Sequence, residues 1–174
     1  MTPWMLLSAA LAAPPTVSVG QHALSFSLPA INEEVTEELI SSTQLSLSDF
    51  IGVNPSLPQK ALVVYFFNRS DGGMALPSLN RIQKRYSSKG VQVIAVSTDV
   101  GPIGGLSTWI QEQKLIYPVL RDSHQIVASR YGIDQLPFAL IIDSEGYIFA
   151  MGRPMGEDFD ESVEAELRPL LGEQ

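Results

Sequence analysis

The sequence predicts a three-layer α/β sandwich, in which a central mixed β-sheet is covered by helices on both faces. Continuous apolar runs at 61–67, 91–97 and 138–142 are typical of strands buried on both faces of a sheet. Segments with helical spacing of apolar residues separate these runs, and such alternation favours parallel strand pairs. The turn at 143–146 precedes a fourth apolar segment, which predicts an antiparallel hairpin at one edge of the sheet.

The N-terminal part of the folded chain is predicted to be a β extension of this sandwich. Apolar and polar residues alternate over 23–28 and over 45–50, which is the period of a half-buried strand. Between these segments, residues 32–42 carry four glutamates around three apolar residues. This pattern fits either a short acidic helix or a solvated loop.

Three segments are predicted to be helices. The first follows the strand at 61–67, the second covers about 126–131 and the third is C-terminal. The apolar residues at helical spacing are Leu76, Leu79, Ile82 and Tyr86 in the first helix and Phe159, Val163, Leu167 and Leu170 in the third. The predicted order of elements is therefore β-β-β-α-β-α-β-β-α.

Size and composition indicate one globular domain, predicted at residues 16–174. Of the 174 residues, 45% are apolar and 17% are charged, and the formal net charge is −8. This charge argues against nucleic acid and anionic membranes as partners, because both require a basic surface. The chain has no cysteine and only two histidines, His22 and His124. We therefore expect no metal and no cofactor.

The first residues are predicted to be a signal peptide, residues 1–13. An apolar run at 4–13 is followed by two prolines, and residues 10–12 have the small-x-small pattern of a cleavage site. The run is too short to span a membrane. We expect export, most simply to a bacterial periplasm; the alternatives are a tethered apolar tail or a frayed terminus.

Seven short motifs follow one another along the chain. They are V-G-Q-H-A-L-S-F-S-L-P at 19–29, L-S-L-S-D-F-I-G at 45–52, V-V-Y-F-F at 63–67, V-I-A-V-S-T-D at 93–99, Y-P-V-L-R-D at 117–122, Y-G-I at 131–133 and Q-L-P-F-A-L-I-I-D-S-E-G at 135–146. In this order they resemble the thioredoxin superfamily, specifically its exported TlpA-like and AhpC/TSA, peroxiredoxin-like redoxins. The resemblance covers residues 19–171 and implies the thioredoxin-like version of the sandwich.

The sequence departs from this family at the residues that carry out its thiol chemistry. In the family the first long strand ends at a W-C-x-x-C turn, and the following helix carries a proline. Here the turn at 68–73 reads N-R-S-D-G-G, and Pro77 matches the proline. Counting back from Pro77 places Arg69 and Gly72 where the two cysteines would stand. Thiol–disulfide exchange requires an attacking and a leaving thiolate, so we predict no catalytic residue.

Two further residues are candidates for binding. The resemblance implies that Pro137 is the family's cis-proline and that the backbone of Leu136 holds an extended polypeptide beside the turn. The alternative is that Pro137 only maintains the fold.

The turn itself could form a site. Ser70 or Asp71 could cap the following helix, and Gly72 and Gly73 would let the backbone approach a ligand closely. Amides at a helix N-terminus favour an anion, with Arg69 adding positive charge and Asp71 opposing it. The simpler interpretation is capping alone. The predicted binding residues are Arg69, Ser70, Asp71, Gly72, Gly73, Leu136 and Pro137.

The predicted function is a redox-inactive, exported domain that binds a polypeptide or serves as a scaffold or accessory subunit. One alternative is the thiol–disulfide oxidoreductase or peroxiredoxin activity that the family implies. The other is a cysteine-independent enzyme that uses Ser70 and Asp71. Trp109, Met151 and Met155 either line a binding groove or belong to the core.

Overall fold

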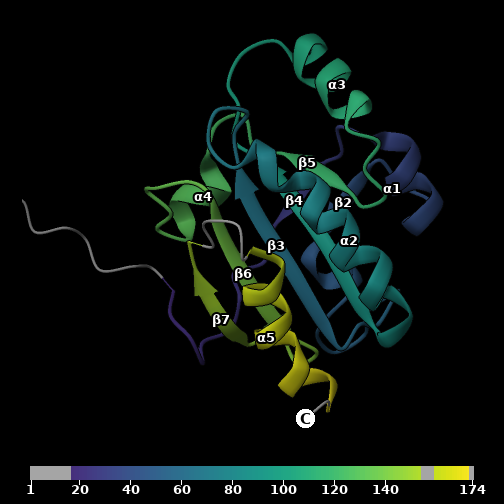
Figure 1. Cartoon of the computed structure of the whole chain (residues 1–174), viewed down its shortest axis with the longest axis vertical. Helices are drawn as coiled ribbons and strands as arrows, with labels where there is room; N and C mark the ends of the chain where they lie inside the picture. Colours follow the sequence, from purple (N-terminus) through teal and green to yellow (C-terminus); the bar gives the residue numbers. More distant parts are fainter. Residues whose placement is uncertain (1–16, 154–158, 173–174) are drawn as a thin grey trace, which may run out of the picture.

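The computed structural model of the chain describes residues 17–153 and 159–172 (Figure 1). The strands are β1 (Ser27–Pro29), β2 (Gln44–Ser46), β3 (Ala61–Phe67), β4 (Val91–Ser97), β5 (Val119–Arg121), β6 (Phe138–Asp143) and β7 (Ile148–Gly152). The α-helices are α1 (Glu33–Ile40), α2 (Leu76–Tyr86), α3 (Ile103–Glu112), α4 (Ile126–Arg130) and α5 (Phe159–Leu171), and 3₁₀ turns lie at η1 (Leu47–Asp49), η2 (Gly73–Ala75) and η3 (Ser87–Lys89). The predicted signal peptide lies outside the described residues.

A five-stranded mixed sheet forms the centre of the molecule, in the order β5-β4-β3-β6-β7. The pairs β3–β4 and β4–β5 are parallel, whereas β6 and β7 run antiparallel to their neighbours. The predicted α/β class with a mixed central sheet is therefore confirmed. Because β3, β4 and β5 are parallel, their carboxyl ends meet at the same edge of the sheet, where the turn at 68–73 begins.

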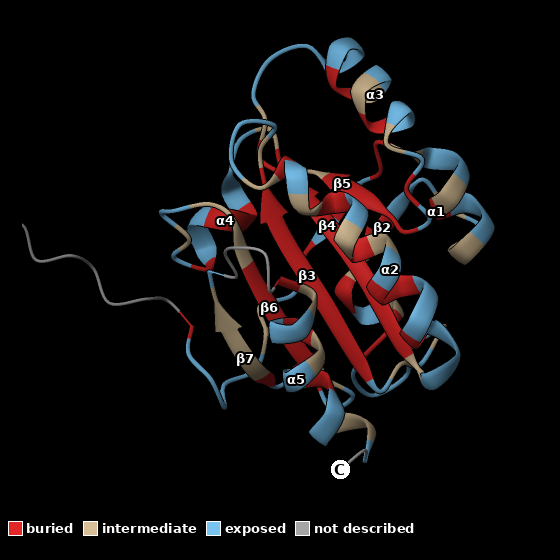
Figure 2. Ribbon diagram, viewed as in Figure 1, coloured by how far each residue is buried: buried red, intermediate tan, exposed pale blue. Residues whose placement is uncertain are grey.

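Side chains of the central strands alternate between two apolar layers, and the sheet is the most buried part of the structure (Figure 2). In β3, Val63 and Tyr65 face the layer of α2 and α5, whereas Val64 faces the opposite layer. Helices α2 and α5 lie side by side over their face and are linked by ion pairs from Arg81 and Arg85 (Figure 1).

The second face is covered by the N-terminal segments and α4. Phe26 and Leu28, together with Leu45, Leu47 and Phe50, pack there against β3 and β6. Strands β1 and β2 form a separate two-stranded antiparallel sheet. None of the helices within the described residues is long and apolar enough to cross a membrane.

The predicted N-terminal strands are shorter in the structure. The strand expected over 23–28 is reduced to β1, because Ala23 donates its amide to the Gly146 carbonyl at 2.8 Å and runs beside the start of β7 instead. The strand expected over 45–50 ends at Ser46, whose amide donates to the Asp49 carboxylate at 2.7 Å and closes η1. Of the two interpretations of residues 32–42, the helix is correct.

Two elements, α3 and β5, were not among those predicted. Helix α3 carries Gly104 and Gly105, which have low helix propensity, and it is held by Leu106 and Ile110, which pack into the core. Strand β5 has only three residues and is held in extended conformation by its pairing with β4. Both depend on tertiary contacts more than on local pattern.

Candidate functional site

The turn at 68–73 connects β3 to η2 and closes on itself. The Asn68 amide donates to the Asp71 carbonyl at 3.0 Å, and the Asp71 amide donates to the Asn68 side-chain oxygen at 2.7 Å. A bridge between Asn68 and Gly72 completes the closure. The amide and the side chain of Asn68 thus form the hydrogen bonds that close the turn.

The predicted capping role of Ser70 and Asp71 is wrong. The residue at the N-cap of η2 is Gly72 and that of α2 is Ala75, and neither helix has a side-chain cap. Ser70 and Asp71 are exposed, and neither side chain has a hydrogen-bond partner within residues 17–153 and 159–172. No base therefore activates the Ser70 hydroxyl in this arrangement.

Arg69 is anchored by Asp99, which follows β4. The Arg69 amide donates to both carboxylate oxygens, at 3.3 and 3.1 Å, and its Nε lies 3.6 Å from Oδ1. The Ser97 hydroxyl donates to the same carboxylate at 2.9 Å. The Arg69 side chain is 49% exposed and that of Asp99 is 15% exposed. The positive charge expected to attract an anion therefore already has a carboxylate partner.

Gly72, which the resemblance aligns with the second cysteine, has no room for a side chain. Its φ is +97°, a backbone conformation that favours glycine. A Cβ atom there would lie 2.7 Å from the Cβ of Pro137 and 2.7 Å from the Tyr65 hydroxyl oxygen. The Tyr65 hydroxyl also donates to the Gly72 carbonyl at 3.1 Å. This turn conformation therefore requires glycine at position 72, and a cysteine there would be sterically excluded.

Gly73 is crowded from the other side. A Cβ atom at this position would lie 3.0 Å from the indole of Trp109, which also packs against Phe67 with ring centroids 6.4 Å apart. Trp109 therefore belongs to the packing beneath the turn. The close approach expected at Gly72 and Gly73 is made to protein groups. Met155 lies outside the described residues.

The Leu136–Pro137 edge lies against this turn, because Pro137 packs on Gly72. The Leu136–Pro137 peptide bond is cis. The Leu136 carbonyl accepts a hydrogen bond from Arg153 Nη2 at 2.9 Å, and Arg153 Nη1 donates to the Gln135 side-chain oxygen at 2.7 Å. The Leu136 amide has no hydrogen-bond partner among the described residues. Nothing in the sequence pattern pointed to Arg153.

Two buried tyrosines fix the chain beneath the turn. Burial raises the pKa of the Tyr65 hydroxyl, which therefore stays protonated and donates to Gly72. Burial, together with the neighbouring Tyr65, also raises the pKa of Tyr117, whose hydroxyl donates to the Leu76 carbonyl at 2.9 Å. Both groups act as hydrogen-bond donors at neutral pH.

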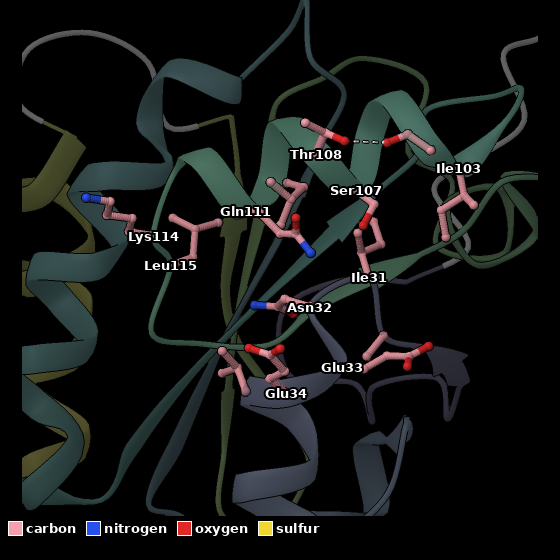
Figure 3. A pocket seen from close by; sticks show the side chains of 14 residues that line it. Ile31, Asn32, Glu33, Glu34, Ile103, Ser107, Thr108, Gln111, Lys114 and Leu115 are labelled. Carbon is pink, nitrogen blue, oxygen red and sulfur yellow. Dashed lines mark hydrogen bonds between the residues drawn. The ribbon is translucent and has the colours of Figure 1, made fainter.

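One hollow in the surface of the described residues is separate from the turn. A hollow of about 930 Å³ lies between the start of α1 and α3 (Figure 3), with Glu33 and Glu34 on one wall and Gln111 on the other. None of the predicted binding residues lines it. A smaller hollow of about 340 Å³ lies between β6, β7 and α5, and Arg153 and Met151 help to line it.

The two histidines serve no common site. The His22 ring stacks on Tyr147 with centroids 3.9 Å apart, and His124 is exposed. Within the described parts of the chain, no three histidine or carboxylate side chains gather as metal ligands.

The model of the AhpC/TSA family matches residues 19–151. The chain belongs to the AhpC/TSA family. The resemblance derived from the seven motifs is thereby confirmed, and this family member has no cysteine.

The chain is similar in sequence to curated proteins that are named thiol-disulfide oxidoreductases. The protein ResA of Oceanobacillus iheyensis is 30% identical over 131 residues, which are 75% of this chain and 62% of that protein. ResA of Bacillus anthracis is 28% identical over 95 residues, which are 55% of this chain and 53% of that protein. The chain thus spans about half the length of several curated relatives that it matches.

Solved structures share the fold of this AhpC/TSA chain. A protein assigned as a thiol:disulfide interchange protein, DsbE, from Chlorobium tepidum has a TM-score of 0.74 at 22% identity, covering 90% of this chain and 99% of that one. The thioredoxin domain of a thiol-disulfide oxidoreductase from Bacteroides vulgatus has a TM-score of 0.64 at 23% identity, covering 86% and 97%. At these identities the likeness establishes the thioredoxin-like fold alone.

Proposed function

We propose that this AhpC/TSA-family chain is a redox-inactive domain that binds extended polypeptide segments at the Leu136–Pro137 edge. The observation that carries the proposal is the Leu136 amide, which lacks a partner among the described residues and sits beside the closed turn. A scaffold or accessory role without peptide binding is the alternative within the same proposal.

The redox-inactive part rests on chemistry and on space. Thiol–disulfide exchange proceeds through two thiolates, and this chain supplies none. The positions aligned with the two cysteines are Arg69, which is held by Asp99, and Gly72, which is enclosed by Tyr65 and Pro137. We therefore expect no thiol-dependent turnover from the chain itself, although its relatives are named oxidoreductases.

The binding part rests on the backbone at the edge. A residue before proline is biased toward extended conformations, and an extended segment can pair with an open amide as an added strand does. Each main-chain hydrogen bond of this kind contributes about 0.5–1.5 kcal/mol. Leu136 is half-buried, so a bound segment would also cover apolar surface there.

Two measurements test the proposal. Purified protein should show no dithiol-dependent reduction of insulin above background. In an NMR titration with a pool of acetylated, amidated random nonapeptides, amide shifts should concentrate at Gln135, Leu136 and Gly72. Shifts confined to the hollow between α1 and α3, or none at all, would contradict binding at this edge. Insulin reduction that follows the protein through repurification would contradict redox inactivity.

A backbone variant isolates the open amide. Replacing the Leu136 amide by an ester, through semisynthesis, removes the donor and keeps the side chain. Affinity for the peptide pool should fall by about threefold to tenfold, which corresponds to one hydrogen bond. The same replacement at exposed Val53 should leave affinity unchanged.

Export is proposed separately, on the apolar run at 4–13 and the small-x-small pattern at 10–12. The exported protein should begin at or near Ala13 when its N-terminus is sequenced. Protein that keeps Met1 and stays in the cytoplasmic fraction would contradict export.

A further inference from the structure

Arg153 binds neutral oxygens, in contrast to the arginines that form ion pairs in the structure. Arg69, Arg81 and Arg85 each pair with a carboxylate. Arg153 instead donates to two neutral oxygens, the Gln135 side-chain oxygen and the Leu136 carbonyl. Within the described residues no carboxylate lies within ion-pair distance of it. Counting only residues 17–153 and 159–172, the exposed Arg153 guanidinium therefore has no counter-charge at the proposed binding edge.

This contact affects any segment that pairs there. A strand that uses the Leu136 amide would also present its own N–H to the Leu136 carbonyl, as in antiparallel pairing. The guanidinium already occupies that carbonyl at 2.9 Å. A neutral segment must leave the carbonyl to Arg153 or displace the guanidinium without compensating its charge.

A segment with a carboxylate side chain gives the displaced Arg153 guanidinium a new hydrogen-bond acceptor. The planar guanidinium matches a carboxylate in two parallel hydrogen bonds, and such charge-assisted bonds are roughly twice as strong as neutral ones. Moving Arg153 onto the carboxylate frees the Leu136 carbonyl for the strand. We infer that Arg153 is a specificity-determining residue that selects acidic polypeptide segments at the Leu136–Pro137 edge. The inference rests on the proposed function.

Among the other charged residues near the edge, some favour an acidic segment and others oppose it. Arg69, in the adjoining turn, keeps half of its side chain exposed and adds positive charge. Glu166 lines the smaller hollow together with Arg153, Asp71 is exposed in the adjoining turn, and Asp134 is exposed just before Gln135 and Leu136. Exposed charges are screened over about 8 Å at physiological salt. Direct contact with Arg153 therefore decides the preference under those conditions, against the overall charge of −8.

The test uses a positional-scanning library of acetylated, amidated nonapeptides, so that side-chain carboxylates are the only acidic groups. Each sublibrary fixes one position as Glu or as Gln, and affinity for the full chain is measured by fluorescence polarisation at physiological salt. At one or two positions Glu should bind about fivefold more tightly than Gln, because a charge-assisted bond replaces a neutral one.

Substitution of Arg153 should change the two sublibraries in opposite directions. In Arg153→Ala the Glu sublibrary should bind more weakly and the Gln sublibrary more tightly than in the wild type, because the Leu136 carbonyl is free. Arg153→Lys should keep part of the preference. The matched control is Arg130→Ala, since Arg130 also donates to a backbone carbonyl, that of Ser25 at 3.0 Å, and should leave the preference unchanged.

The outcomes separate this inference from the proposed function. Equal binding of Glu and Gln sublibraries by the wild type, or an equal loss of both in Arg153→Ala, overturns the role of Arg153 and leaves peptide binding standing. Failure of every sublibrary to bind the folded wild type overturns the proposed function and this inference with it.

Discussion

Replacing Gly72 by alanine tests whether the turn excludes a side chain. A non-glycine residue held at a φ of +97° costs on the order of 1–3 kcal/mol. The added Cβ would overlap the Cβ of Pro137 and the Tyr65 hydroxyl, both at 2.7 Å, and overpacking of this kind costs about 1–3 kcal/mol more. Gly72→Ala should therefore lower the free energy of unfolding by about 2–6 kcal/mol.

A second substitution identifies the source of the loss. Tyr65→Phe removes one of the two overlapping atoms, although it also removes the hydrogen bond to the Gly72 carbonyl, a loss of about 1 kcal/mol. The Tyr65→Phe, Gly72→Ala double variant should therefore be destabilised by less than the sum of the single variants, by about 0.5–2 kcal/mol.

Urea denaturation followed by far-ultraviolet circular dichroism measures all three variants. The matched control is Gly104→Ala, because Gly104 lies in α3 and a Cβ there meets nothing within 4 Å. This control should stabilise the protein by about 0.5–1 kcal/mol through helix propensity. If Gly72→Ala leaves the free energy of unfolding unchanged or raises it as the control does, a side chain fits at position 72 and the steric argument against redox chemistry is wrong.

Three further changes test the surroundings of the site. Asp99→Ala should destabilise the turn by about 1–3 kcal/mol and increase amide hydrogen exchange at Arg69, because the half-buried acceptor of its amide is lost; unchanged exchange would refute the anchoring role. Asp122→Ala should cost about 2–4 kcal/mol in urea denaturation, since this buried carboxylate accepts amides of α4 at 2.9 Å, and Asp122→Asn should recover part of the loss. Burial raises the pKa of Tyr131 to about 12. Because the unfolded chain ionises first, the stability contributed by Tyr131 is complete below about pH 10 and is lost from there to about pH 12. The urea midpoint should therefore fall between about pH 10 and pH 12, and less steeply in Tyr131→Phe.

The sequence predicts the centre of the fold better than its margins. The strands at 61–67 and 91–97 agree with β3 and β4 residue for residue, because a continuous apolar run fits only a position covered on both faces. Strand β5 is too short to show a period, and α3 contains two adjacent glycines, so both become apparent only through tertiary contacts.

At the candidate site, sequence reasoning locates the turn but not its contacts. Counting back from Pro77 places Arg69 and Gly72 correctly in the turn after β3. The cap predicted for Ser70 or Asp71 fails because η2 begins only at Gly73, so that Gly72 takes the N-cap position. The contact between Arg153 and Leu136 joins residues 17 positions apart through a side chain and a backbone carbonyl. No periodicity or motif reports such a contact.

The enclosure of Gly72 has an evolutionary consequence. A mutation that brings a cysteine to this position meets the Pro137 and Tyr65 atoms at 2.7 Å before it can provide any chemistry. The mutation becomes tolerable only after the turn has been reshaped or Tyr65 has been replaced, and neither change has a catalytic benefit alone. A dithiol at this turn therefore requires at least two coordinated changes, of which the cysteine at position 72 alone would lower stability.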